Sequence, residues 1–187
     1  SQKSWTISGD NLDLACSIGF ITPDVYVSEW DMSKPHSTGN ATELATNFLG
    51  TNFVVEYINL ADPTDKGIVP NASSPFKLTG LSANAKYRLI AYPNPNVPGS
   101  VFKGLSASGS DTKRLSKVTQ WGTNEWKSLE GAFGSCENMD ITATDVPTFK
   151  AGINLSNMFS NCISLVYNPS INNWDMSGVT NISSMFA

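Results

Sequence analysis

Phenylalanine recurs at an almost constant spacing in the second half of the chain, each time directly after a small or apolar residue. Phe133, Phe159 and Phe186 lie 26 and then 27 residues apart. A unit of this length cannot bury its own apolar side, so neighbouring units must stack and share one core. The spacing therefore predicts that these three phenylalanine rings stack in one column.

Other residues keep the same register as the phenylalanines. Cys136 and Cys162 each follow a phenylalanine by three residues, and Leu129, Leu155 and Ile182 each precede one by four. A period of 26 to 27 residues with Leu, Phe, Cys and a short strand predicts a leucine-rich solenoid. Cysteine is small and often buried, which suits a tight bend inside such a stack.

Two stretches of this repeat resemble a known family. The sequences "WGTNEWKSLEGAFGSCENM" and "INNWDMSGVTNISSMF" are similar to the repeating unit of the BspA-like leucine-rich-repeat proteins of bacterial surfaces. Trp174 and Asp175 occupy the Trp-Asp position of that unit, and Met176 stands where the family usually has threonine. The resemblance covers roughly residues 118–187. It implies a surface-exposed or secreted protein, commonly an adhesin or a matrix-binding factor.

Tryptophan has a structural role in this interpretation. We expect Trp174 to pack within the repeat and Asp175 to close the turn with its side chain. Trp121 and Trp126 precede the first complete unit, and we expect them to cap the open N-terminal end of the solenoid. The other end needs a cap as well, because a bare coil exposes apolar edges. We therefore expect the repeats to continue beyond Ala187.

The first part of the chain has a different pattern. Runs such as "TNFVVEYINL" and "AKYRLIAY" alternate in polarity and are separated by turn sequences such as "DPTDKG". Several strands within about 100 residues predict a β-sandwich. The stretch "FKLTGLSANAKYRLIAYPNP", with Gly80, Leu81 and Tyr87, resembles the late strands of fibronectin type III and immunoglobulin-like domains. The predicted fold is mainly β, with a sandwich over residues 1–112 and the solenoid over residues 113–187.

Composition narrows the possible partners and locations. Charged residues make up 15% of the chain, the net charge is −4, and no basic block occurs. A nucleic-acid partner is not expected, since binding its backbone needs clustered Lys and Arg. No stretch approaches 18 consecutive apolar residues, so we expect no membrane span. The neutral, Ser-, Thr- and Asn-rich composition favours an extracellular or cell-surface location.

The cysteines and the single histidine offer little reactive chemistry. Cys136 and Cys162 are predicted to be buried free thiols, although stacked coils about 4.8 Å apart would also permit a disulfide. Cys16 is expected in the core of the sandwich. We expect no metal site, because zinc needs four close ligands and His36 is remote in sequence.

Sequence motifs of catalysis are missing from the chain. It contains no G-x-S-x-G nucleophile elbow, no G-x-G-x-x-G and no Walker loop. The carboxylate pairs Asp10/Asp13 and Asp62/Asp65 match no calcium loop and are interpreted as turn residues. The chain is therefore expected not to be an enzyme and to need no cofactor.

Three functions remain for a chain of this kind. The first is a non-catalytic adhesion protein that binds a protein or glycan of a host or neighbouring cell. Its contact face would be the concave strands near residues 138–143 and 165–171, with Asp140, Thr142, Val166 and Asn168 as ligand-binding residues. The alternatives are an architectural subunit of a surface appendage, surface assembly or viral particle, and an accessory region of a larger glycan-active enzyme.

Overall fold

The computed structural model describes residues 24–37 and 39–187. This part of the chain is mainly β and has very little helix, which confirms the predicted class. Cys16, Asp10 and Asp13 lie outside the described residues. The first eight strands are β1 (Tyr26–Asp31), β2 (Leu44–Ala45), β3 (Phe48–Thr51), β4 (Phe53–Asn59), β5 (Lys66–Ala72), β6 (Lys77–Leu78), β7 (Lys86–Pro93) and β8 (Val101–Leu105).

The remaining elements are shorter and alternate with turns. They are the 3₁₀ helix η1 (Thr112–Arg114), strands β9 (Leu115–Gln120), β10 (Glu125–Trp126), β11 (Asp140–Ile141), β12 (Thr148–Phe149) and β13 (Ile153–Asn154), the 3₁₀ helix η2 (Pro169–Asn173), and strand β14 (Val179–Asn181). None of the helical segments in the described chain is long and apolar enough to cross a bilayer.

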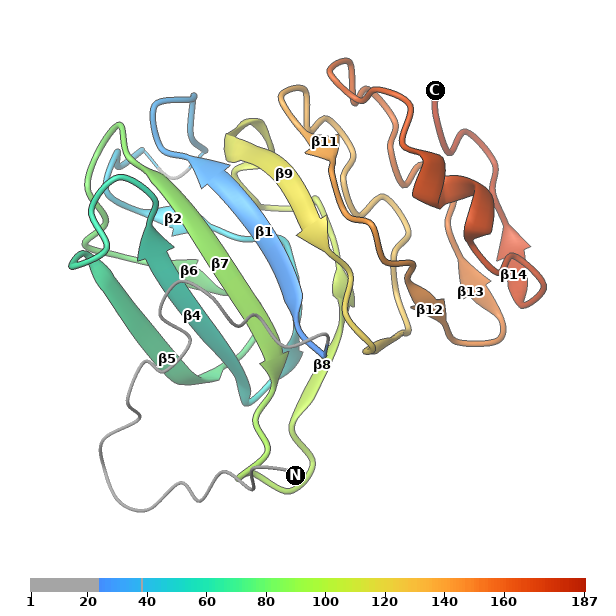
Figure 1. Cartoon of the computed structure of the whole chain (residues 1–187), viewed down its shortest axis with the longest axis horizontal. Helices are drawn as coiled ribbons and strands as arrows, with labels where there is room; N and C mark the ends of the chain where they lie inside the picture. The colour runs from blue at the N-terminus through green and yellow to red at the C-terminus, as the bar shows by residue number, and fades with distance from the viewer. Residues whose placement is uncertain (1–23, 38) are drawn as a thin grey trace.

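A six-stranded open sheet forms the larger layer, in the order β11-β9-β1-β7-β4-β5 (Figure 1). Its pairs are antiparallel except for β11 and β9, which run parallel. In β1, Tyr26, Ser28 and Trp30 alternate toward the inner face and are fully buried. At one edge, β5 carries Pro70, which has no main-chain N–H to offer to another strand.

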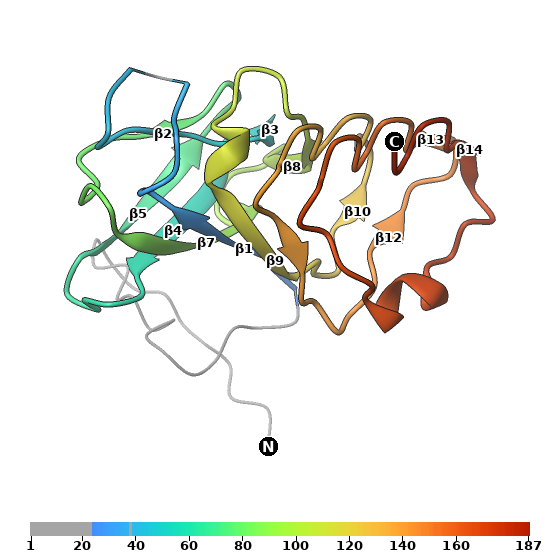
Figure 2. The same cartoon turned by 90° about the horizontal axis from the view of Figure 1, so that it is seen from above.

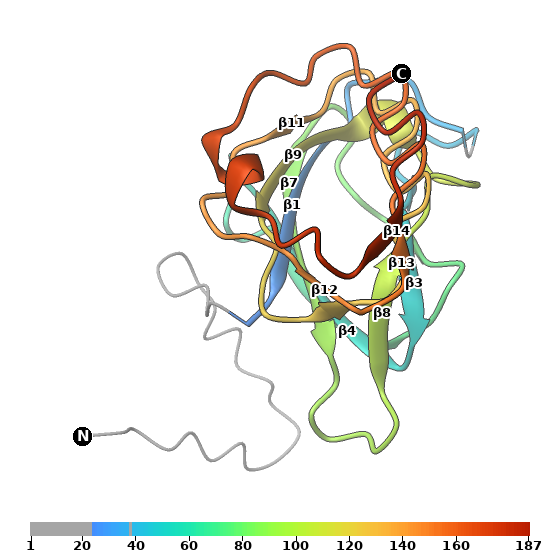
Figure 3. The same cartoon turned by 90° about the vertical axis from the view of Figure 1, so that its right-hand side faces the viewer.

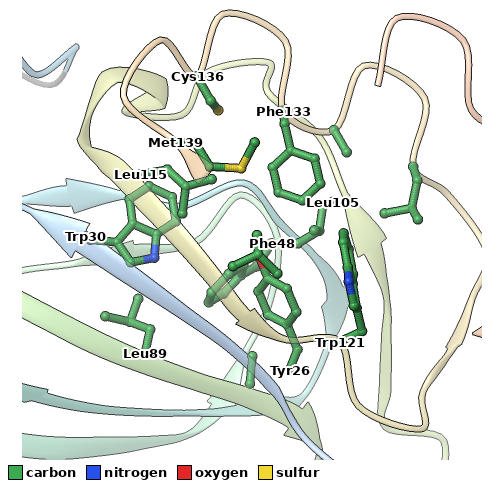
Figure 4. Close-up of a cluster of buried hydrophobic side chains, with 14 of the residues drawn as sticks. Tyr26, Trp30, Phe48, Leu89, Leu105, Leu115, Trp121, Phe133, Cys136 and Met139 are labelled. Carbon is green, nitrogen blue, oxygen red and sulfur yellow. The ribbon is translucent and has the colours of Figure 1, made fainter. Parts of the chain in front are cut away.

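Two short antiparallel pairs, β2–β6 and β3–β8, lie against the inner face of this sheet. Aromatic rings from both layers meet between them. Tyr26 of β1 lies 5.9 Å from Phe48 of β3 and 6.0 Å from Phe102 of β8, measured between ring centroids. Figure 4 shows that the same cluster reaches Phe133 and Met139, which lie in the repeat region. One hydrophobic core is therefore shared by the two regions of the chain.

Both layers continue into the repeat region through parallel pairing. β9 pairs with β11, where Lys117 lies opposite Asp140, and Gly104 of β8 forms a parallel bridge with Ser128. The predicted boundary between residues 112 and 113 falls inside η1, which joins β8 to β9. The six-stranded sheet and the core extend across this position, while the division into domains stays a prediction.

Three turn segments of the repeat region stack side by side and form a ridge. We define the ridge as residues 128–136, 154–162 and 181–187, its first, second and third segments. Main-chain hydrogen bonds join successive segments, for example from Phe133 N to Met158 O at 2.9 Å and from Phe159 N to Met185 O at 2.8 Å. Figures 2 and 3 show these turns in a row and in projection along the stack.

The phenylalanine rings stack along this ridge. The ring centroids of Phe133 and Phe159 are 5.3 Å apart with an interplanar angle of 5°, and those of Phe159 and Phe186 are 5.3 Å apart at 17°. Each segment also contains a residue with left-handed backbone at the same register. These are Gly131, Asn157 and Ser184, with φ of 57°, 55° and 52°. Glycine and asparagine adopt this conformation readily, which explains how such tight turns recur.

The leucine-rich-repeat solenoid is not seen in the structure. Its predicted contact strand at residues 165–171 does not form, since this segment runs into η2. Pro169 lacks an N–H, and the Asn168 side chain accepts a hydrogen bond from Ser170 N at the start of that helix. Apart from β9, the strands that pair in parallel are only two or three residues long, and β10–β12 and β13–β14 are separate pairs. Successive repeat units are therefore joined by stacked turns rather than by a continuous row of strands.

Candidate functional site

Two of the four predicted ligand-binding residues make hydrogen bonds within the fold. The Asp140 carboxylate accepts from the main-chain N–H of Val166 at 3.2 Å. The Asn168 side chain donates to the carbonyl oxygens of Ile141 at 2.7 Å and Ala143 at 3.1 Å. These contacts attach residues 166–168 to the segment that contains β11. Oδ1 of Asp140 and the side-chain amide of Asn168 thus already have hydrogen-bond partners within the fold.

The other two predicted residues lie on the surface. Thr142 is exposed, and the Val166 side chain is 62% exposed. Val166 continues the exposed surface onto its neighbours, since Ile163 is 80% and Tyr167 is 73% exposed. The structure therefore shows an apolar surface at Ile163, Val166 and Tyr167, and the assignment of Thr142 and Val166 to a ligand stays a prediction.

Trp174 and Asp175 lie where the repeat meets the shared core. Trp174 is buried and packs edge-on against Trp121, with ring centroids 5.4 Å apart. The exposed Asp175 carboxylate accepts a hydrogen bond from Ser177 N at 3.0 Å and so closes a turn. Hydrogen bonding from Ser177 holds the pKa of Asp175 below its ordinary value. Trp121 and Trp126 are fully buried inside the core, beside Tyr26.

The two repeat cysteines are free thiols in an environment that disfavours their ionised form. Burial, with a smaller contribution from Cys162, raises the pKa of Cys136 well above its ordinary value. Burial also raises the pKa of Cys162 to about 11, and its Sγ donates to the carbonyl oxygen of Phe133 at 3.0 Å. Both thiols are therefore protonated at neutral pH. Within residues 24–37 and 39–187, no group of His, Cys, Asp and Glu side chains has a metal-binding arrangement.

Exposed apolar side chains concentrate at one end of the fold. The described chain exposes eight large apolar side chains, and only Leu60 and Val146 lie outside residues 163–186. The other six, named here the distal apolar residues, are Ile163, Val166, Tyr167, Met176, Ile182 and Phe186. This end lies farthest from β5 (Figure 1). A concentration of exposed apolar residues marks a candidate interaction surface.

A second candidate is a surface hollow of about 460 Å³ near β2, β3 and β6. Residues 45–49, 74–77, 106, 108 and 109 form its walls. Lys77 is the one charged residue among those that line it, and its ammonium group pairs with Glu43 at 3.0 Å. The hollow thus contains no pair of groups for acid–base chemistry. The distal apolar residues are the stronger candidate.

Residues 101–187 match a family model described as "Mycoplasma protein of unknown function, DUF285". The chain is similar to that family over this region, which is less than half of its length. The match begins at the first residue of β8, the strand that pairs with the repeat region. No curated protein and no solved structure matches the chain significantly.

The match corrects both family resemblances. No BspA-like leucine-rich-repeat model matches, and the one matching model covers none of residues 1–100, so the fibronectin type III or immunoglobulin-like assignment has no match either. The physical reason is that a 26-residue register of Phe and Cys requires only stacked units with a shared core. The register does not specify which kind of unit stacks, so it could not distinguish between repeat families.

Among the distal apolar residues, sequence reasoning assigned only Val166 to a contact surface. It named Met176, Ile182 and Phe186 as repeat positions, and it missed Ile163 and Tyr167. Phe186 was placed in a buried column, yet its side chain is 58% exposed, while Phe159 in the middle of the column is 2% exposed. A signal was available in the sequence. Val166 and Tyr167 are adjacent apolar residues that come after Cys162 and are not among the repeated positions named above.

Proposed function

We propose that this chain is a non-catalytic, surface-exposed binding module that recognises a partner through its distal apolar residues. The observation that carries the proposal is their concentration: of the eight large apolar side chains exposed within residues 24–37 and 39–187, six lie in residues 163–186. Full burial of a Val, Ile or Phe side chain contributes roughly 1.5–3 kcal/mol. A partner that covers several of them would therefore gain substantial binding free energy.

The rest of the fold suits a support for such a surface. We propose that the six-stranded sheet and the pairs β2–β6 and β3–β8 act as a β-sandwich that holds the ridge. The shared core supports this role, since Trp121 packs against both Tyr26 of β1 and Phe133 of the ridge. Binding surfaces on a rigid scaffold lose less conformational entropy when the partner binds. An extracellular or cell-surface location is part of the proposal.

The test is a binding assay with the purified chain on intact host or neighbouring cells and on a glycan array. A variant with Val166→Asn and Tyr167→Asn should lose binding by at least about tenfold, since each substitution removes apolar contact area. Leu60→Asn is the matched control, because Leu60 is an exposed apolar residue in the β4–β5 connection. Equal binding by all three proteins would contradict the proposal.

The second candidate is an architectural subunit, because exposed apolar side chains at one end also suit contact with another subunit of an assembly. Light scattering separates the two functions. Assembly of the chain into larger particles that Val166→Asn and Tyr167→Asn abolish would favour the architectural role. Binding to cells or glycans by a chain that remains monomeric would favour the adhesion role.

A further inference from the structure

Three neighbouring strands each place an aromatic side chain in the core and a lysine directly after it. The dipeptides are Phe102-Lys103 in β8, Trp126-Lys127 at the end of β10 and Phe149-Lys150 at the end of β12. Figure 2 shows these strands in that order. The aromatic rings face inward, since Phe102 and Trp126 are buried with ring centroids 5.7 Å apart, and Phe149 packs against the same core.

The three lysines lie side by side on the outer face of these strands. Lys127 N donates to Lys103 O at 2.8 Å, and Lys150 N donates to Trp126 O at 2.9 Å. Successive residues of a strand point to opposite faces, so the lysine after each inward aromatic residue points to solvent. Lys103, Lys127 and Lys150 are all exposed, and we name them the lysine row. Because neighbouring strands lie about 4.8 Å apart, the row spans roughly 10 Å.

No acidic side chain neutralises the lysine row. Within residues 24–37 and 39–187, none of its three ammonium groups forms an ion pair, and the basic residues that do are Lys77, Lys86, Arg88, Lys113, Arg114 and Lys117. Like charges opposite one another on neighbouring strands destabilise a sheet. The fold thus holds three repelling charges together, and a bound anion would relieve this repulsion.

The lysine row lies inside the stack, with paired chain on both sides. Gly50 of β3 pairs with Phe102 of β8 on one side. On the other side the stack continues past Lys150, since Gly152 N donates to Gly178 O at 2.8 Å. The lysines point sideways from the direction in which the units stack. A further unit stacked on the third ridge segment would therefore leave the row open to solvent.

Acidic side chains confine the positive surface to a narrow row. Glu125 precedes Lys127 by two residues, so it points to the same side, and it is exposed. Asp175 is exposed on the segment that follows Lys150, next to Trp174, whose ring lies 5.6 Å from that of Phe149. The positive charge therefore extends across the strands at one level rather than over a broad patch.

We propose that the lysine row binds a linear, sulfated polysaccharide. Its sulfate groups accept charge-assisted hydrogen bonds from the ammonium groups of Lys103, Lys127 and Lys150 and balance their charge. This site is separate from the distal apolar residues and goes beyond the proposed function.

The row suits such a glycan better than other anionic partners. Single-stranded nucleic acids bind through exposed aromatic side chains on which their bases stack, whereas the aromatic residues beside this row face the core. An anionic membrane presents its charge over a plane, so Glu125 and Asp175 would be repelled by it together with the attraction of the lysines. A linear polyanion can follow the row and avoid both carboxylates.

The test is isothermal titration calorimetry of the full chain with heparin, a sulfated polysaccharide, at several salt concentrations. Replacing all three lysines of the row by glutamine should weaken binding by at least about tenfold and flatten its salt dependence, because exposed charges are screened by salt. Asp175→Asn should strengthen binding, since it removes a negative charge near the row while its side-chain oxygen can still accept from Ser177 N.

The matched control replaces Lys77, Lys86 and Lys113 by glutamine. It removes the same charge from three exposed lysines that are each paired with a carboxylate, and it should change binding by less than about twofold. Thermal unfolding checks the fold of both variants. The variant without the row should unfold at the same or a higher temperature than the unmodified chain, because the repulsion among its lysines is gone.

Three results would overturn the proposal. The first is equal weakening of heparin binding by the row variant and the control variant, which would reduce the effect to total charge. The second is equal binding of heparin and of chemically desulfated heparin. The third is tighter binding to a DNA oligonucleotide or to vesicles that contain phosphatidylserine, which would assign the row to another partner. Binding that needs both the sulfate groups and the row supports the proposal.

Discussion

Replacing Arg114 is the most informative perturbation of the fold, because its side chain is only 1% exposed. We call Arg114 and Asp111, with the main-chain groups that they bind, the hub. The guanidinium group of Arg114 donates to four main-chain carbonyl groups of the connection between β1 and β2, at distances from 2.6 to 3.4 Å. The acceptors are Lys34, Glu43, Met32 and Ala41. Burial lowers the pKa of Arg114, and the nearby carboxylates of Asp111 and Asp31 oppose this shift.

Asp111 completes the hub from the other side. Its carboxylate lies 4.0 Å from the guanidinium group and accepts hydrogen bonds from Ser37 N, Ser37 Oγ and Ala45 N, at 2.5, 2.8 and 2.8 Å. The long distance between the charges means that main-chain carbonyl groups, rather than the ion pair alone, hold Arg114. The hub thereby fastens the β1–β2 connection to η1, where the two layers enter the repeat region.

We expect Arg114→Met to destabilise the protein by about 3–5 kcal/mol, because it leaves buried carbonyl groups without donors and the Asp111 charge without a counterion. For a chain of this size, this corresponds to a fall in Tm of roughly 10 °C. Urea unfolding followed by tryptophan fluorescence measures the change, since the described tryptophans are buried.

Arg88→Met is the matched control. Arg88 is 34% exposed and pairs with Glu29 at 3.0 Å, so its loss should cost about 1 kcal/mol or less. Arg114→Lys should fall between the two variants, since an ammonium group has three donors against five in the guanidinium group. A loss of stability below about 1 kcal/mol for Arg114→Met would refute the reasoning, because removing a buried group with several hydrogen bonds should destabilise the protein more than removing a surface ion pair.

Three further predictions concern the core, the thiols and the pH dependence. Phe159→Ala should cost about 3–5 kcal/mol in urea unfolding, whereas the exposed Phe186→Ala should cost about 1 kcal/mol or less; equal costs would contradict the stacking argument. Cys136 and Cys162 should react with a thiol reagent at pH 8 far more slowly than free cysteine, in a variant whose third cysteine is serine, because the thiolate is the reactive form. Burial alone would raise the pKa of Asp65, but three side-chain hydrogen bonds outweigh it and lower the pKa. The stability that Asp65 contributes should therefore be full above its unfolded pKa of about 3.9 and fall as the pH drops through the lower folded value, so the difference from Asp65→Asn should shrink below about pH 4.

The strand content of the first part could be read from local patterns. In β7, Tyr87, Leu89 and Ala91 alternate toward the core, as the polarity of the sequence predicts. The partner of each strand could not be read in the same way. β1 pairs with both β7 and β9, which lie about 60 and 90 residues away. Pairing over such distances depends on the whole core rather than on the local sequence.

The hydrogen-bond partners of the predicted site residues could not be read from the sequence. Asp140 and Asn168 were assigned to a ligand because polar residues on a predicted contact strand normally face solvent. In the structure, the backbone at residues 165–171 is not a strand. Asp140 accepts a hydrogen bond from a main-chain N–H, and Asn168 donates to two main-chain carbonyl groups, while their assignment to a ligand stays a prediction. Polar character in a sequence does not reveal whether water, a ligand or the protein's own backbone provides the partner.

By itself, the sequence determined that this protein is mainly β and that its second half repeats, because alternation and spacing are properties of neighbouring residues. Only the tertiary structure decided that β8 and β9 pair with the repeat region, that one core joins both regions, and that Phe186 is exposed while Phe159 is buried. These features depend on which segments meet in space. Phe159 and Phe186 hold the same register but differ in burial because, within residues 24–37 and 39–187, a further segment stacks on Phe159 and none stacks on Phe186.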